Sequence, residues 1–279
     1  MKGFATPPGR EARRALMLAA LLTAGFLLPA VFADLLAPFD PSAVDLSGGL
    51  QPPDASHLLG RDQQGADILS RLIHGAQISL FVGFWTVTVS TLLGVAVGLL
   101  AGYAGGWVEQ LLMRLVDVLL AFPGLLLAIA LVAMLGAGKG NVVIALSALG
   151  WTGFARLVRG QVLAVKNLDY VQAAEGLGAN HLRIMGRHIL PNIMAPVLVQ
   201  SSFAIAGAIL SEASLSFLGL GVAVGEPSWG AMLSEGRYVL FEAPFVSIFP
   251  GTAIMLVVLG FNLLGDAVAD WLDPKRRVS

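Results

Sequence analysis

Six long runs of residues without a charged side chain divide the sequence. A helix that crosses the hydrocarbon core of a bilayer needs about 20 mostly apolar residues, because each residue advances about 1.5 Å through a core about 30 Å thick. The runs cover residues 15–33, 72–108, 118–138, 140–155, 189–211 and 244–265. The sequence therefore predicts an all-α integral membrane protein with six transmembrane helices.

The composition excludes several classes of function. Hydrophobic residues make up 56% of the chain and charged residues 13%, whereas soluble domains carry about 25% charged residues. The net charge of −1 argues against binding to nucleic acid, which requires clustered Lys and Arg. The chain has no cysteine, so a disulfide, a thiolate metal site and a cysteine nucleophile are excluded. The histidines, at positions 57, 74, 181 and 188, lack the spacing of a metal site, and we expect none.

The positions of Lys and Arg predict the orientation, because cytoplasmic loops carry an excess of both. With the N-terminus inside, the cytoplasmic side collects Lys2, Arg10, Arg13, Arg14, Arg114, Arg156, Arg159, Lys166, Arg183, Arg187, Lys275, Arg276 and Arg277. The outer side keeps Arg61, Arg71, Lys139 and Arg237. This bias predicts that both termini lie in the cytoplasm.

The first apolar run has an alternative interpretation as a secretory signal peptide, since basic residues precede it and small residues, Ala30 and Ala33, lie near its end. A signal core spans about 7 to 15 residues, and the run 15–33 is longer. Its removal would also place the later basic segments on opposite sides of the membrane. We therefore expect the first helix to be retained.

The segments outside the membrane divide the chain further. Residues 34–75 and about 219–243 are rich in turn residues and predict ordered outer loops, either simple connectors or a landing surface for a partner. We expect an N-terminus and first helix at residues 1–33, an outer loop region at 34–75 and a transmembrane core at 76–279.

The inner segment from Arg156 to about Pro191 mixes basic and apolar residues. A helix is predicted to begin near Asp169, to break at Gly178 and to be followed by a second helix that ends at Pro191. Such an amphipathic helix-turn-helix either lies on the lipid surface or docks into another protein.

The same inner segment resembles the cytoplasmic EAA loop of the membrane subunits of ABC importers, through Gln172-Ala173-Ala174, Gly178 and Leu190-Pro191. Nearly the whole chain is similar to the C-type permease of the dipeptide, oligopeptide and nickel branch. The matching segments are residues 57–70, 101–107, 113–117 with 121–123, 187–192, 216–221, 227–230 and 261–266.

The resemblance implies a type I importer permease in the cytoplasmic (inner) membrane of a bacterium or archaeon. Its partners would be a second homologous permease, two ATP-binding subunits and an extracytoplasmic solute-binding protein. ATP and Mg would bind to the partner subunits, this chain would hold no cofactor and it would not itself be an enzyme. The coupling loop would cover about residues 161–191. Its contacts with an ATP-binding subunit would be Tyr170, Gln172, Ala173, Ala174, Glu175, Gly178 and Leu182.

Two residues depart from the general pattern of this loop. Gln172 stands where Glu is expected, and His188 stands where Ile is expected. Gln172 lacks a charge that would pair with a basic residue of the partner, and Glu175, one turn later, is a substitute.

Three further patterns each have two interpretations. The segment 136–140 looks like a phosphate-binding loop, but Ala133 and Gly140 stand where a Walker A motif needs Gly and Ser or Thr, so a tight outer turn is expected. Gly94 and Gly98 predict close packing with another helix. The alternative is that they only reflect the general abundance of glycine in this chain. Arg114 and Asp117 are three apart and can pair.

Glu212 begins a stretch near the outer end of the fifth run, where Ser214, Ser216 and Phe217 follow. We expect these residues to form a gate or pathway wall, with a structural hydrogen bond of Glu212 to a neighbouring helix as the alternative.

We predict a permease subunit of an ATP-driven importer of di- or oligopeptides or related small solutes, with the solute itself left open. The alternative is an ion-coupled transporter or a membrane-embedded enzyme. An enzyme would place paired carboxylates, a His cluster or a nucleophile at one membrane depth, and a proton-coupled carrier would need carboxylates in the middle of a span. The charged residues of this chain lie instead at the ends of the apolar runs.

Overall fold

The computed structural model describes residues 10–223 and 225–272, with side chains inside the first helix from Met17 onward. This part of the chain contains helices and no strand. The helices are α1 (Arg10–Val31), α2 (Ala33–Leu36), α3 (Ile68–Ala104), α4 (Gly106–Leu120), α5 (Gly124–Leu135), α6 (Lys139–Val165), α7 (Asp169–Gly176), α8 (His181–Arg183), α9 (Leu190–Phe217), α10 (Trp229–Gly236) and α11 (Phe245–Leu272). Short 3-10 turns lie at Leu46–Gly48 (η1) and Arg237–Val239 (η3), and a π-helix (η2) spans Ile184–Ile189.

Four helices are long and apolar enough to cross a membrane: α3, α6, α11 and the continuous helix from His181 to Phe217 that contains α9. The bent pair α4 and α5 gives a fifth span if the two are counted together, and α1 contributes a shorter apolar stretch, Met17–Val31. The all-helical membrane fold is therefore confirmed, whereas the predicted count of six includes one broken span and one short helix.

The third predicted run is not one straight span. α4 and α5 meet at an angle of 85°, and the break falls at Ala121, Phe122 and Pro123. Proline has no N–H for the helical ladder, and its ring disfavours a helical conformation in the preceding residue. Pro123 therefore ends α4 and stands at the start of α5.

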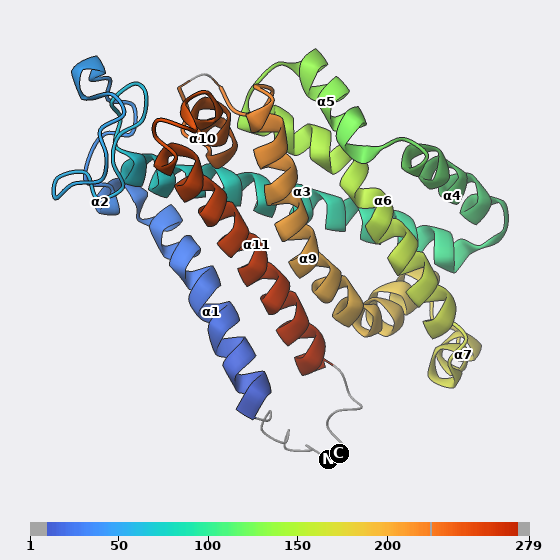
Figure 1. Ribbon diagram of the computed structural model, residues 1–279. Helices are drawn as coiled ribbons and strands as arrows, with labels where there is room; N and C mark the ends of the chain where they lie inside the picture. The colour runs from blue at the N-terminus through green and yellow to red at the C-terminus, as the bar shows by residue number, and fades with distance from the viewer. Residues whose placement is uncertain (1–9, 224, 273–279) are drawn as a thin grey trace.

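The arrangement of the helix ends agrees with the predicted orientation. The start of α1, the end of α11 and the helix α7 lie toward one end of the molecule, and α2 and α10 lie toward the other (Figure 1). The segment 136–140 forms the turn between α5 and α6 on the outer side, with Gly136 and Gly138 at positive φ. Of the basic residues used for orientation, Lys2, Lys275, Arg276 and Arg277 lie outside the described residues.

Glycines bring α3 and α6 into close contact. A Cβ atom added at Gly94 would lie 2.3 Å from Cβ of Phe154, and one added at Gly98 would lie 2.5 Å from the carbonyl oxygen of Ala155. Gly102 continues the same face, with Val162 at 2.8 Å. Any side chain larger than hydrogen at these positions would push the two helices apart.

A buried ionic cluster ties the outer loops to α3. The guanidinium of Arg71, near the start of α3, pairs with Asp62 of the preceding loop and with Glu235 of α10, at 2.7 Å from Oε2. Trp229 at the start of α10 donates its Nε1–H to the carbonyl of Leu72 at 2.9 Å. The two outer segments therefore fold against each other and against one helix.

The outer loop before α3 carries its own hydrogen bonds. The backbone N–H groups of His57 and Ser56 donate to Asp54 and hold the pKa of that carboxyl below its ordinary value. The ring of His57 lies 3.0 Å from Asp67, whose carboxylate caps α3 by accepting from the N–H of Ser70. These contacts hold the loop before α3 in place, and α3 begins at Ile68, inside the predicted loop range 34–75.

Candidate functional site

The inner segment between α6 and α9 folds into a loop with its own apolar core. α7 begins at Asp169 as predicted and is followed by Gly178 at φ 83°. Val171 is buried in a cluster with Val162, Val165, Ile184 and Ile189. The apolar side chains of this loop therefore pack it against the inner ends of α6 and α9.

The sequence predicted that the second helix of the loop ends at Pro191, and this prediction was wrong. The π-helix at Ile184–Ile189 runs directly into α9. Because Pro191 cannot donate to a carbonyl four residues earlier, the wider turn accommodates it, and Asn192 Nδ2 donates to the carbonyl of His188 at 2.7 Å. The loop is thus continuous with a membrane-spanning helix.

The exposed surface of this loop carries large apolar side chains. Leu177 is 89% exposed and Leu182 78% exposed. Among the predicted coupling residues, Tyr170, Gln172, Ala173, Glu175, Gly178 and Leu182 are exposed and Ala174 is partly buried, and their contact with a partner stays a prediction. Exposed apolar side chains rimmed by polar ones mark an interaction surface.

Hydrogen bonds fasten the loop to the inner end of α3. The hydroxyl of Tyr103 lies 2.8 Å from Nδ1 of His181, and Nζ of Lys166 donates to the carbonyl of Gly102 at 2.8 Å. No role for Tyr103 could be predicted from the sequence, because its partner is 78 positions away. The loop is therefore bonded to α3 as well as packed against α6 and α9.

The four residues expected at a gate point in two directions. Glu212 and Ser216 are buried, and the carboxylate accepts hydrogen bonds from Ser216 Oγ at 2.7 Å and from Ser79 Oγ of α3 at 3.0 Å. Ser214 and Phe217 instead line a recess of about 350 Å³ beside Leu233 and Ile254. Glu212 thus makes a hydrogen bond to a neighbouring helix, which is the alternative predicted for it, and its part in a gate stays a prediction.

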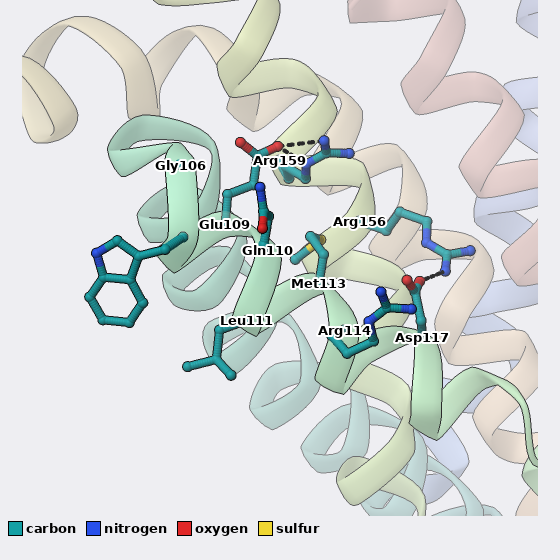
Figure 2. Close-up of a pocket in the computed structure, with 10 residues that line it drawn as sticks. Gly106, Glu109, Gln110, Leu111, Met113, Arg114, Asp117, Arg156 and Arg159 are labelled. Carbon is teal, nitrogen blue, oxygen red and sulfur yellow. Dashed lines mark hydrogen bonds and ion pairs between the residues drawn. The ribbon is translucent and has the colours of Figure 1, made fainter.

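A charged cleft of about 900 Å³ lies between α4 and α6 (Figure 2). Arg159 Nε donates to Glu109 at 2.6 Å, and Arg156 donates to Asp117 at 2.7 Å. The sequence left Arg114 and Asp117 as a possible pair, but Asp117 pairs with Arg156. Arg114 lines the cleft and has no ion pair among the described residues. The cleft therefore offers one cation to an anionic group.

Comparisons with known proteins agree with these features. Residues 94–278 match the family model described as binding-protein-dependent transport system inner membrane component. A dipeptide transport system permease protein DppC of Alkalihalophilus pseudofirmus is 43% identical over 98% of this chain and 92% of that protein. A glutathione transport system permease protein GsiD of Pectobacterium atrosepticum is 48% identical over 88% of this chain and 82% of that protein.

The fold also matches a solved structure. An inward-facing MetNI methionine ABC transporter chain superposes with a TM-score of 0.62 over 74% of this chain and 98% of that chain, at 16% identity. At this identity the match concerns the fold alone. The family match covers more than half of the sequence, from the second half of α3 to residue 278. The chain therefore belongs to the inner membrane components of binding-protein-dependent transport systems, the permease subunits of ABC importers.

Proposed function

We propose that this permease imports dipeptides or glutathione-like peptides, using ATP hydrolysed by partner subunits. The relatives named as dipeptide and glutathione permeases support the substrate class, since each is more than 40% identical over most of the chain. The main support for an ATP-driven mechanism is the inner loop between α6 and α9, which has a packed apolar core and exposed apolar side chains.

The coupling surface would bind an ATP-binding subunit. Leu177 and Leu182 expose apolar area to water, and covering that area with a partner would favour binding. Gln172 donates to the carbonyl of Asn167 at 3.3 Å, so it turns back onto its own loop. Glu175 is exposed and is the carboxylate available to a basic residue of the partner. ATP and Mg would be held by that partner.

The remaining partners follow the family. A second homologous permease would complete the membrane portion as a heterodimer, with two ATP-binding subunits inside and a solute-binding protein outside. The fused outer segments around Arg71 and Glu235 would form the surface on which the solute-binding protein lands. Ser214 and Phe217 would face a recess beside α10 and α11 that changes shape as the outer gate moves. Gly94 and Gly98 would keep α3 and α6 moving as one body.

The test is ATPase activity in a complex reconstituted from this chain, a second permease, two ATP-binding subunits and a solute-binding protein of the same organism. The expected result is that the solute-binding protein raises the ATPase rate severalfold when loaded with dialanine or with reduced glutathione. A rate that responds to neither ligand would overturn the proposed substrate class. A rate that is the same without this chain would overturn the coupling.

A further inference from the structure

Two neighbouring cavities beside the α4–α5 break share part of their lining, and we call them together the groove. A wider cavity of about 420 Å³ opens between Phe122 and α6, and a narrower one of about 150 Å³ lies between α3, α6 and α9. Both are lined by Leu146, Gly150 and Ser211. The groove therefore runs from the surface at the helix break inward to α3.

The groove lies halfway through the membrane. Its α6 residues fall between Leu146 and Phe154, near the centre of a helix that spans Lys139–Val165. The break between α4 and α5 lies at the same level, because Phe122 lines the same cavity. Irregular backbone at this depth is tolerated where it is covered by protein or lines a water-filled cavity. This face of the permease therefore does not face lipid tails.

At its buried end, next to α3, the groove is lined by two residues whose hydroxyl groups have no hydrogen-bond partner in the described structure. Thr86 and Ser90 of α3 are 5% and 2% exposed, and Thr86 Oγ1 and Ser90 Oγ make no hydrogen bond in the described structure. Buried hydroxyl groups are nearly always paired, and an unpaired one indicates an unseen water or ligand. A cavity of this volume has room for a few water molecules.

Glycine keeps the hydroxyl groups accessible from the groove. A Cβ atom added at Gly150 would lie 2.5 Å from Ser90 Oγ, so a larger residue would crowd this hydroxyl group from the side of the shared lining. Ser211 on α9 lines both cavities, and its Oγ donates to the carbonyl of Gly207 at 2.8 Å. Three residues with a hydroxyl group, from two helices, therefore line the smaller cavity. We call this space, lined by Thr86, Ser90, Ser211 and Gly150, the hydroxyl groove.

The lining of the hydroxyl groove defines the ligand it can take. No charged side chain lines either cavity, so the groove does not select an anion or a cation. A hydroxyl group both donates and accepts hydrogen bonds, which suits a peptide amide with its one N–H and one C=O. We propose that the hydroxyl groove is a wall of the translocation pathway that exchanges water for the amide groups of a passing peptide.

This inference rests on the proposed peptide import, and its test measures uptake of labelled dialanine by the complete complex in proteoliposomes. We expect the double substitution Thr86→Val and Ser90→Ala to lower uptake per ATP hydrolysed at least threefold. The melting temperature should stay equal or rise, because the lost hydroxyl groups have no protein partner. Ser202→Ala is the matched control, since its hydroxyl bonds to the carbonyl of Leu198 outside the groove. Unchanged uptake by the double variant would overturn the proposal.

A second measurement does not depend on the folding of that variant. The chain has no natural cysteine, so Ser211→Cys places a single thiol in the groove. We expect a membrane-impermeant cationic methanethiosulfonate to label it in the complex, and dialanine to slow the labelling during turnover. A thiol that stays unlabelled in every state would overturn the proposal. Wild-type complex that imports no dialanine would overturn the proposed function as well, whereas normal import with unprotected labelling would overturn the groove alone.

Discussion

The contact between α3 and α6 predicts a strong effect from adding one methyl group. In Gly98→Ala, the new Cβ would lie 2.5 Å from the carbonyl oxygen of Ala155 and 2.8 Å from Cβ of Val158, where 3.4 Å is an ordinary contact. The helices would have to separate by several tenths of an ångström along their shared face. Overpacking of this kind costs about 1–3 kcal/mol, which exceeds the gain in helix propensity of about 0.5–1 kcal/mol from replacing Gly.

The matched control is Gly207→Ala on α9, where nothing lies within 4 Å of the added Cβ. Thermal unfolding of the purified protein in detergent, followed by tryptophan fluorescence, measures both variants. Since 1 kcal/mol shifts the melting temperature of a protein of this size by about 2–4 °C, Gly98→Ala should melt several degrees lower and Gly207→Ala at or above the wild-type temperature. Equal melting temperatures for the two variants would refute the close packing of α3 on α6.

Three further perturbations test other parts of the structure. Arg71→Ala leaves Asp62 buried without its cation, so the melting temperature should fall by the equivalent of about 3 kcal/mol, and a fall no larger than that of Arg237→Ala would contradict the buried cluster. Tyr103→Phe removes only the hydroxyl that meets His181; peptide uptake per ATP should drop about twofold with normal complex assembly, and an unchanged ratio would remove α3 from the coupling route. Ala174→Pro breaks α7 and should leave the chain inserted while ATP use no longer drives uptake, and uptake at the wild-type rate would sink the coupling surface.

The membrane fold and the coupling loop were predictable because both rest on local pattern. A long run without charged residues indicates a helix that is surrounded by lipid. The mixture of apolar and polar residues from Asp169 to Ile189 is enough to indicate a packed loop. Pro123 could have indicated the break in the third run, but the residues on both sides of it are apolar, so the whole run was interpreted as one span. One straight span satisfied the same length and charge criteria.

The contacts of the functional residues were not predictable, because they join distant parts of the chain. Glu212 meets Ser79 across 133 positions, and Arg71 meets Glu235 across 164. No local pattern distinguishes a carboxylate fastened between two helices from one that faces a pathway. The hydroxyl groove was missed for the same reason, since single serines and threonines in apolar helices carry no periodic signal.

Whether ATP used by partner subunits drives this permease is tested most directly by uptake of labelled dialanine into proteoliposomes that hold the complete complex, with the solute-binding protein outside and ATP inside. Uptake should require ATP and should stop with a non-hydrolysable analogue, whatever ion gradient is applied. Uptake by this chain without the ATP-binding subunits, driven by a proton or sodium gradient, would contradict a permease that is moved from inside by its partner.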